Sequence, residues 1–280
     1  MKRIIYVVLL LTIAFSAFQA KAQNDAMSAY WDDVDFTDTA LIASKQFEDR
    51  IVDFLYQYSC CDEEEFEFKS ILGAGTILAK AKANMRVYEH VLEFLLNGYT
   101  AMGKSQVVDY LLSYPQVWDG GIHVTVEELD RLDSITAPYQ QVKLYAKAPD
   151  FYGITIDNEP YSIYESSAKY ILVVFWSTDC EYCHDFLVKI RKHLNLKTDF
   201  ELVTFALAEN QEEVEAAVKK MRLPGYHFYD DLRWDSKAFL DYHVISTPTV
   251  FVLDEEKKIA CKPYDWYELK DWLKLNNLSY

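Results

Sequence analysis

YILVVFWSTDCEYC, residues 170–183, begins with seven continuously apolar residues. A short run of this kind is typical of a strand that is buried on both faces of a sheet. After the two cysteines, apolar residues recur with helical spacing at positions 186, 187, 190 and 194. The sequence therefore predicts a strand that leads into a helix, with a Cys-x-x-Cys pair at the junction.

This position gives the two cysteines a defined chemistry. Cys180 is expected at the N-terminus of the helix, where free N–H groups and the helix dipole favour a thiolate. Cys183 follows one turn later, close enough to form a disulfide with Cys180. Attack by the Cys180 thiolate on a disulfide would give a mixed disulfide, which Cys183 would then resolve.

A second informative segment, Ser246-Thr247-Pro248-Thr249, precedes a predicted strand at residues 250–253. Proline is tolerated at the first residue of a strand. A cis Thr247–Pro248 bond could bring backbone against the cysteine pair and hold an extended substrate there. An ordinary trans proline at the edge of a strand is the alternative that the sequence leaves open.

The rest of the chain separates into two regions of different texture. From residue 146 to 280, short extended runs alternate with helical runs, which predicts an α/β domain with a mixed sheet. Residues 23–145 show mainly helical periodicity and predict a small all-α domain of four or five helices. The α/β strands are expected at residues 153–156, 161–164, 170–176, 200–207, 249–253 and 258–262, and its helices at 186–194, 212–221, 234–242 and 266–275.

The first 22 residues have the three-part layout of a secretory signal peptide. Lys2 and Arg3 precede an apolar run at residues 4–18, and Ala20-Lys21-Ala22 supplies a cleavage site. The apolar run is shorter than the about 20 residues of a transmembrane helix, and an uncleaved anchor is the alternative. We expect a periplasmic or otherwise secreted protein without a lipid-bearing cysteine, in a compartment that permits disulfides and with no stable membrane insertion after cleavage.

Composition limits the remaining classes. The 280 residues are 51% hydrophobic and carry a formal net charge of −16, which disfavours disorder and nucleic-acid binding through a basic face. The histidines lack paired metal spacing, so we expect no metal and no cofactor. Adjacent Cys60 and Cys61 would form a strained bridge and are expected to be thiols. Cys261 is expected as a small core residue.

Residues 148–280 resemble the thioredoxin superfamily, specifically the periplasmic TlpA/ResA/DsbE-like thiol-disulfide oxidoreductases. The resemblance rests on APDF at 148–151, VFWSTDCEYC at 174–183 and TPTVFVLD at 247–254, in that order. It implies a thioredoxin-like fold, in which helices flank a mixed central sheet.

The resemblance also implies roles. Cys180 would be the nucleophile and Cys183 the resolving cysteine of a redox-active disulfide. Pro248 would be the cis-proline of a substrate groove to which Thr247 and Trp176 also contribute. Thiols and disulfides of other exported proteins would be the substrates, a membrane thiol reductant would supply electrons, and cell redox homeostasis would be the setting.

The sequence departs from the thioredoxin pattern around the cysteines. Val174 stands where thioredoxins carry an aspartate that assists proton transfer. Asp179 and Glu181 place negative charge beside Cys180, which disfavours a thiolate, and with His184 they are the candidates for tuning the pKa of Cys180. A less acidic Cys180 favours a reductase over a strong oxidant.

Two other functions remain open on the sequence alone. Cys180-x-x-Cys183-His184 also has the pattern of a c-type haem attachment site. The buried strand upstream and the Thr-Pro segment downstream count against it. Alternatively, the thioredoxin-like domain could be a non-catalytic scaffold, with the helical domain binding a partner. We favour an exported oxidoreductase that reduces disulfides of other exported proteins.

Overall fold

The computed structural model describes residues 25–59, 65–113, 124–150, 152–196 and 199–278. The predicted signal peptide and the pair Cys60 and Cys61 lie outside the described residues. Within the described part of the chain, no helix is both long enough and apolar enough to cross a membrane.

Contacts between residues divide the chain into two compact units. The helical unit comprises residues up to 98 together with 113–132, and the sheet unit comprises residues 99–112 and 133–280. The segment before residue 146 is tied to the sheet unit by backbone pairing, since the Tyr145 N–H donates to the Ile259 carbonyl at 2.8 Å. The division by contacts therefore differs from the single boundary at 145/146 that the sequence predicts.

The helical unit is built around aromatic side chains. Trp31 is 1% exposed and packs edge-on against Phe54, with ring centroids 5.0 Å apart. A buried carboxylate, Glu89, accepts a hydrogen bond from Arg131 Nε at 2.9 Å, which compensates for its burial. The elements are the 3-10 helix η1 (Thr39–Ala43) and the helices α2 (Lys45–Ser59), α3 (Phe66–Ala81), most of α4 (Met85–Ala101) and the first half of α6 (Val126–Gln141).

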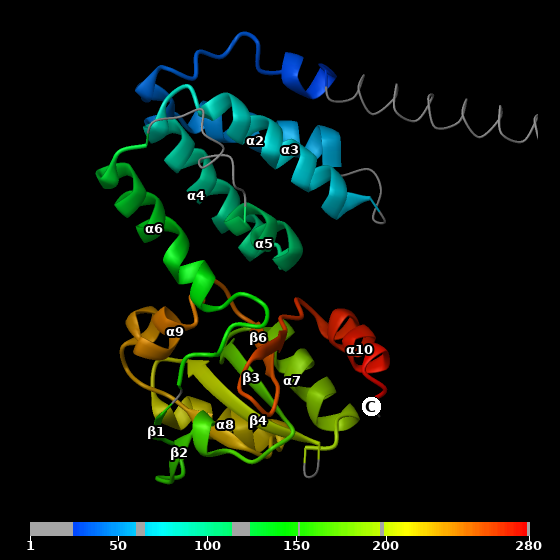
Figure 1. The fold of residues 1–280 in the computed structure, drawn as a ribbon. Helices are drawn as coiled ribbons and strands as arrows, with labels where there is room; N and C mark the ends of the chain where they lie inside the picture. Colours follow the sequence, from blue (N-terminus) through cyan, green and yellow to red (C-terminus); the bar gives the residue numbers. More distant parts are fainter. Residues whose placement is uncertain (1–24, 60–64, 114–123, 151, 197–198, 279–280) are drawn as a thin grey trace, which may run out of the picture. The chain divides into compact units, whose positions relative to one another are not determined.

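The sheet unit contains a five-stranded mixed sheet in the order β5-β4-β3-β6-β7. Strands β3, β4 and β6 of this sheet are labelled in Figure 1. Its central strand β3 pairs in parallel with β4 and antiparallel with β6. The strands are β3 (Tyr170–Ser177), β4 (Phe200–Leu207), β5 (Tyr226–Phe228), β6 (Thr249–Leu253) and β7 (Ile259–Cys261), with a separate hairpin of β1 (Tyr152–Ile154) and β2 (Pro160–Ser162). The helices are α5 (Ser105–Ser113), α7 (Glu181–His193), α8 (Gln211–Met221), α9 (Lys237–Asp241) and α10 (Trp266–Leu275).

Strand β3 is buried on both faces, as its unbroken apolar run predicts. Leu172, Val174 and Trp176 belong to the core that also contains side chains of α7, α8 and α10. Ile171, Val173 and Phe175 belong to the core on the other face, which includes side chains of α9. The α/β fold with a mixed sheet flanked by helices is confirmed, and so is the helical region that precedes it.

Several predicted boundaries are wrong for local reasons. The strand expected at 161–164 ends at Ser162, because the Ser162 hydroxyl accepts the Tyr164 N–H at 3.1 Å and caps the 3-10 helix η3 (Ile163–Glu165). The helix expected at 234–242 is interrupted at Ser236, between the 3-10 helix η4 (Arg233–Asp235) and α9. Helix α3 carries no clear sequence signal, since Gly73 and Gly75 lie in its interior.

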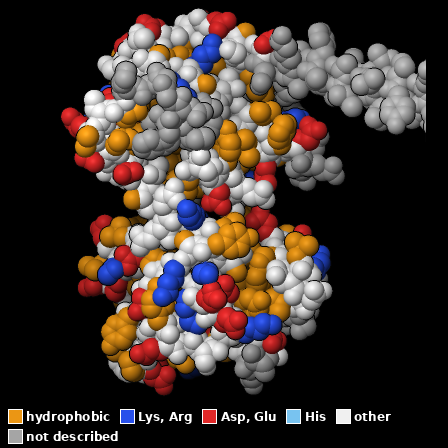
Figure 2. Space-filling view, in the orientation of Figure 1, with side chains coloured by type: hydrophobic (Ala, Val, Ile, Leu, Met, Phe, Trp, Pro, Cys, Tyr) orange, Lys and Arg blue, Asp and Glu red, His pale blue; other side chains and the backbone are white. Residues whose placement is uncertain are grey.

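Figure 2 shows acidic and basic side chains interspersed on one face of the sheet unit, around groups of apolar side chains. The exposed aromatic residues of this unit include Tyr182, Tyr264 and Tyr267. Exposed aromatic groups of this kind are common at sites of protein contact.

Candidate functional site

The candidate site lies where β3 ends and α7 begins. Cys180 is the N-cap of α7, with extended backbone angles of φ −96° and ψ 102°. Its Sγ accepts a hydrogen bond from the Cys183 N–H at 3.1 Å, in the position that a serine or aspartate oxygen takes in other helices. The Ser177 hydroxyl accepts the Asp179 N–H at 3.3 Å and shapes the turn before the cysteine. Local capping thus places the Cys180 sulfur over the free N–H groups of the helix.

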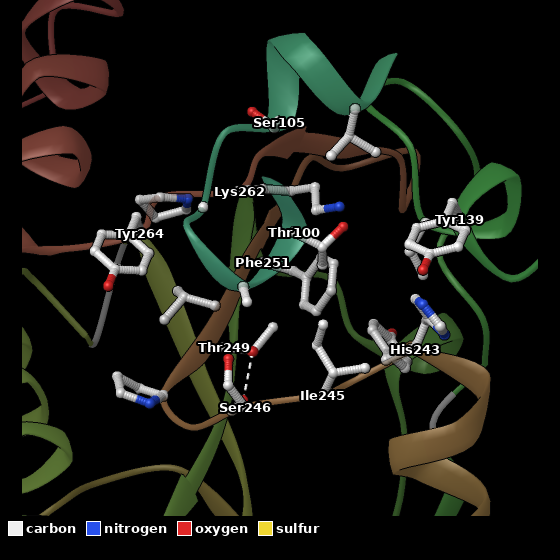
Figure 3. A pocket seen from close by; sticks show the side chains of 18 residues that line it. Thr100, Ser105, Tyr139, His243, Ile245, Ser246, Thr249, Phe251, Lys262 and Tyr264 are labelled. Atoms are coloured by element: carbon white, nitrogen blue, oxygen red, sulfur yellow. Dashed lines mark hydrogen bonds between the residues drawn. The ribbon is translucent and has the colours of Figure 1, made fainter. Parts of the chain in front are cut away.

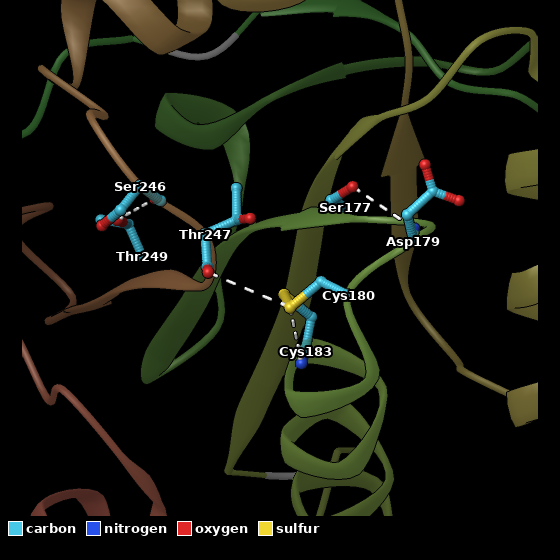
Figure 4. Close-up of a disulfide and its surroundings, with 7 residues drawn as sticks. All are labelled: Ser177, Asp179, Cys180, Cys183, Ser246, Thr247 and Thr249. Atoms are coloured by element: carbon cyan, nitrogen blue, oxygen red, sulfur yellow. Dashed lines mark hydrogen bonds between the residues drawn. A yellow bond between two sulfur atoms is a disulfide. The ribbon is translucent and has the colours of Figure 1, made fainter.

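Cys180 and Cys183 form a disulfide, with Cα atoms 5.2 Å apart (Figure 4). The two sulfurs differ in access. Cys183 is 0% exposed and belongs to the core under the sheet, whereas Cys180 is only partly buried. A partner molecule can therefore reach the Cys180 sulfur first, while Cys183 is placed to attack that sulfur from inside.

The loop before β6 lies against this disulfide. The Thr247–Pro248 peptide bond is cis, which is the isomer that the family resemblance implies. The Thr247 carbonyl oxygen lies 4.0 Å from Cys180 Sγ, although 67 positions separate them in sequence. Figure 4 shows Thr247 facing the cysteine pair across this gap. The loop is held by the Thr249 hydroxyl, which donates to the Ser246 carbonyl at 2.7 Å.

The predicted tuning residues surround the start of α7. Asp179 and Glu181 are both exposed, so they add negative charge at the solvent side of Cys180. Asp185, one turn further, forms an ion pair with Lys189 at 2.7 Å. The His184 ring packs edge-on against Trp176, with centroids 5.7 Å apart. These positions agree with a role near Cys180, and tuning by Asp179, Glu181 and His184 stays a prediction.

Two residues of β3 lie beneath the disulfide. Trp176 is 0% exposed and packs in the same core as Cys183. Substrate binding by Trp176 stays a prediction, and the structure gives its side chain no solvent-exposed surface. Val174 is also 0% exposed and pairs with Thr204 on β4 and Val250 on β6. The position of the thioredoxin aspartate is therefore an apolar position of the core.

One surface feature beside the cysteines is not apparent in the sequence. Tyr182, between the two cysteines, and Tyr264, before α10, are each 49% exposed. Partial burial, followed by the nearby Asp265 and then Tyr264, raises the pKa of Tyr182. The tyrosines come from segments about 80 residues apart, so only the tertiary structure brings them together. They offer aromatic surface next to Cys180.

Comparison with known proteins agrees with this geometry. Residues 167–259 match the family model described as Thioredoxin-like, a range that includes β3, both cysteines and β6. The thioredoxin-like protein YneN of Bacillus subtilis (strain 168) is 31% identical over 114 residues. That match covers 39% of this chain and 65% of YneN, so the chain spans less than two thirds of the relative's length.

A solved structure shares the fold. A thioredoxin-like protein from Bacteroides caccae ATCC 43185 superposes with a TM-score of 0.59 at 15% identity, over 91% of this chain and 93% of that chain. A thiol-disulfide oxidoreductase from Bacteroides fragilis NCTC 9343 is 23% identical, with a TM-score of 0.42, over 46% of this chain and 98% of that chain.

The fold and the sequence match together define a class. The sheet unit has a thioredoxin-like fold with a Cys-x-x-Cys disulfide at the start of α7, and a helical region precedes it. The likeness to the Bacteroides caccae structure covers 91% of this chain, so it extends beyond the sheet unit.

Proposed function

We propose that this protein is a thiol-disulfide oxidoreductase that acts on disulfides of other polypeptides through Cys180 and Cys183. One observation carries the proposal. The two cysteines are bonded to each other at the N-terminus of α7, where the residue Cys180 is only partly buried and Cys183 is fully buried. A purely structural disulfide has no need of a partly exposed cysteine beside a loop whose carbonyl lies 4.0 Å from its sulfur.

The reaction follows from this asymmetry. In the reduced enzyme, the Cys180 thiolate attacks one sulfur of a substrate disulfide, and the other substrate sulfur leaves as a thiolate. The Cys183 thiolate then attacks the Cys180 sulfur, which forms the Cys180–Cys183 bond and releases the second substrate thiolate. Two electrons pass to the substrate, and a thiol reductant must return two electrons to the enzyme for the next cycle.

The chain's own residues prepare both steps. The Cys183 N–H and the helix N-terminus stabilise negative charge on Cys180 Sγ. The carbonyl of Thr247, next to Cys180, offers backbone to an extended substrate. Asp179 and Glu181 work against the thiolate, and this opposition favours the reducing direction over strong oxidation.

The setting follows from the N-terminal sequence and is part of the proposal. Export through the predicted signal peptide would place the enzyme among exported proteins with disulfides, and a membrane thiol reductant would be its electron donor. Haem attachment fits the described residues poorly, because Cys183 is wholly buried in the core and cannot bond a porphyrin without opening the domain.

Peptide-disulfide reduction with thiol alkylation after acid quenching tests the function. We expect the wild type to reduce a disulfide peptide, the Cys180→Ser variant to be inactive, and the Cys183→Ser variant to accumulate a mixed disulfide through Cys180. Two results together would overturn the proposal. The wild-type protein would reduce no disulfide, and alkylation across a glutathione redox series would never show the Cys180 and Cys183 thiols being lost or regained as a pair. A partner bound equally by wild type and the double serine variant would then favour the scaffold.

A further inference from the structure

The sheet unit contains a cavity of about 60 Å³ that adjoins the cis-proline loop. Its walls come from three places: the turn between α4 and α5 with the start of α5, the end of α6, and the segments around β6 and β7. Ser246 and Pro248, the residues on either side of Thr247, both line it. The cavity therefore begins one residue away from the carbonyl that faces Cys180.

The wall contributed by residues 99–112 is closely fitted. Gly103 has φ +68°, and a Cβ atom at this position would lie 2.3 Å from the ring of Tyr264. Only glycine allows the α4–α5 turn to approach this tyrosine so closely. The Lys104 N–H donates to the Tyr99 carbonyl at 2.8 Å and closes the turn.

The lining is mainly apolar but includes an ammonium, an imidazole and hydroxyl groups. Figure 3 shows Lys262, Thr100, Tyr139 and His243 arranged around the space above Ile245. Two polar atoms of this lining, His243 Nε2 and Thr100 Oγ1, are buried without a hydrogen-bond partner among the described residues. Lys262 Nζ lies 5.6 Å from the centre of the Phe251 ring.

Charged groups around the cavity leave an excess of positive charge in its lining. Burial and the positive charge of Lys262 both lower the pKa of His243, which shows that the two groups feel each other. Burial also lowers the pKa of Lys262, while Asp109, which is not among the lining residues, opposes this. Asp109 is itself half-buried, with its pKa raised by burial and lowered by Lys262 and Lys143.

Lys262 lacks an ion-pair partner within 4 Å in the part of the chain that the structure describes. A partly buried ammonium without a close counter-ion gains from an incoming anion. A carboxylate can accept hydrogen bonds from Lys262 and from the Thr100 hydroxyl at once. The chemistry of the lining therefore selects a carboxylate.

We propose that the cavity receives an acidic side chain of the substrate polypeptide, close in sequence to the cysteine that bonds to Cys180. The proposal rests on the proposed function, because it names the substrate class of the same site. An extended chain advances about 3.3 Å per residue, so a residue two positions from the attacked cysteine lies about 7 Å away along the loop. Because a water molecule needs about 10–15 Å³ of such space, the cavity has room for a carboxylate with one or two methylene groups.

Reduction of matched peptides tests this inference. Two sets of disulfide peptides carry Glu, Gln or Lys two positions before or two positions after the attacked cysteine. In one of the two sets, we expect the wild type to reduce the Glu peptide with about tenfold higher kcat/KM than the Gln peptide. This is the factor that corresponds to one hydrogen bond to a charged group, and the difference should lie mainly in KM. Lys262→Met should reduce that preference to less than about twofold.

Lys258→Met is the matched control, because Lys258 is an exposed lysine of the same unit that pairs with Glu256. It should keep the full preference for Glu. Equal kcat/KM for the three peptides in both sets would overturn this inference alone, as would a preference that survives Lys262→Met. Failure to reduce any peptide would overturn the proposed function, and this inference with it.

A free carboxylate is the other source of the same chemistry. Thermal unfolding with millimolar glutarate separates the two. Stabilisation of the wild type but not of Lys262→Met, together with equal reduction of all peptides, would assign the cavity to a small organic acid and overturn the substrate side chain. A Glu preference without stabilisation by glutarate supports the proposal.

Discussion

Val174→Asp places a carboxyl group where thioredoxins carry one, and the structure predicts a large, pH-dependent loss of stability. Val174 is 0% exposed in the core that also holds Trp176 and Cys183. Its cross-strand neighbour Thr204 shares a hydrogen bond with His227 Nδ1 at 2.8 Å. With His227 Nε2 against the Leu223 carbonyl at 3.3 Å, the network assigns the Thr204 hydrogen to His227. Thr204 therefore cannot donate to an ionised carboxylate at position 174.

The magnitude follows from two losses and one titration. Removing the buried valine side chain costs about 1.5 kcal/mol or more, and burying a protonated carboxyl without a fitted partner costs about 1–3 kcal/mol. Burial raises the pKa of the introduced carboxyl above its unfolded value of about 3.9. The folded state then holds more protons than the unfolded state, so stability falls by about 1.4 kcal/mol per pH unit above pH 4, up to the folded pKa.

Urea unfolding at pH 5 and pH 8, with the disulfide kept oxidised, measures this effect. We expect Val174→Asp to lose at least about 3 kcal/mol at pH 5 and clearly more at pH 8, a large part of a typical domain's 5–15 kcal/mol. Val174→Ala serves as the control. It also removes buried side-chain volume but adds no titratable group, so its loss of unfolding free energy relative to the wild type should be the same at both pH values. Equal losses for both variants at both pH values would refute the reasoning, because they would show that position 174 is open to water or has a proton donor.

Three further predictions concern other parts of the chain. Gly103→Ala should lower the free energy of unfolding, measured in urea, by about 1–3 kcal/mol, because it forces alanine into a positive φ and against the Tyr264 ring. Gly98→Ala, in a helix position with open space around it, should raise the free energy of unfolding by about 0.5–1 kcal/mol. Similar values for the two variants would disprove the close fit at Gly103. Glu181→Gln should speed alkylation of reduced Cys180 below pH 8 by about twofold, since it removes a like charge in water-like surroundings; an unchanged rate would show that Glu181 does not act on the thiolate. Burial lowers the pKa of His227, so its folded state binds fewer protons and stability should fall as pH drops below about 6.5, by at most about 1.4 kcal/mol per unit. That slope should be smaller in His227→Gln, and an unchanged slope would mean that another group causes it.

Much of the sheet unit could be read from the sequence because its signals are local. The unbroken apolar run of β3 is buried on both faces, and β4 has the predicted bounds Phe200–Leu207. The N-cap position of Cys180 follows from its place between a strand and a helix. Cys261 is a free, half-buried cysteine, which agrees with its prediction as a small packed residue. Burial is the larger cause, and the charge of Glu268 the second, that raises the pKa of its thiol to about 12.

The sequence was less informative where a few atoms end an element. A single hydroxyl, that of Ser162, stops a strand that β-propensity would continue to residue 164. In α3, Gly73 weakens the helical signal, yet its missing side chain lets the helix approach Leu55 of α2, where a Cβ would lie 3.2 Å from Leu55 Cδ2. Close packing between helices therefore explains a residue that local propensity disfavours.

The sequence by itself determined the strand, the helix and the cysteine pair at their junction, because apolar periodicity and helix capping act over a few neighbouring residues. Only the tertiary structure decided what faces that pair. The Thr247 carbonyl comes within 4.0 Å of Cys180 through antiparallel pairing of β6 with β3, across 67 positions of chain. Likewise, the grouping of residues 99–112 with the sheet unit and the cavity around Lys262 depend on long-range packing. Such contacts are selected by the complementarity of whole surfaces, which leaves no pattern in any short stretch of sequence.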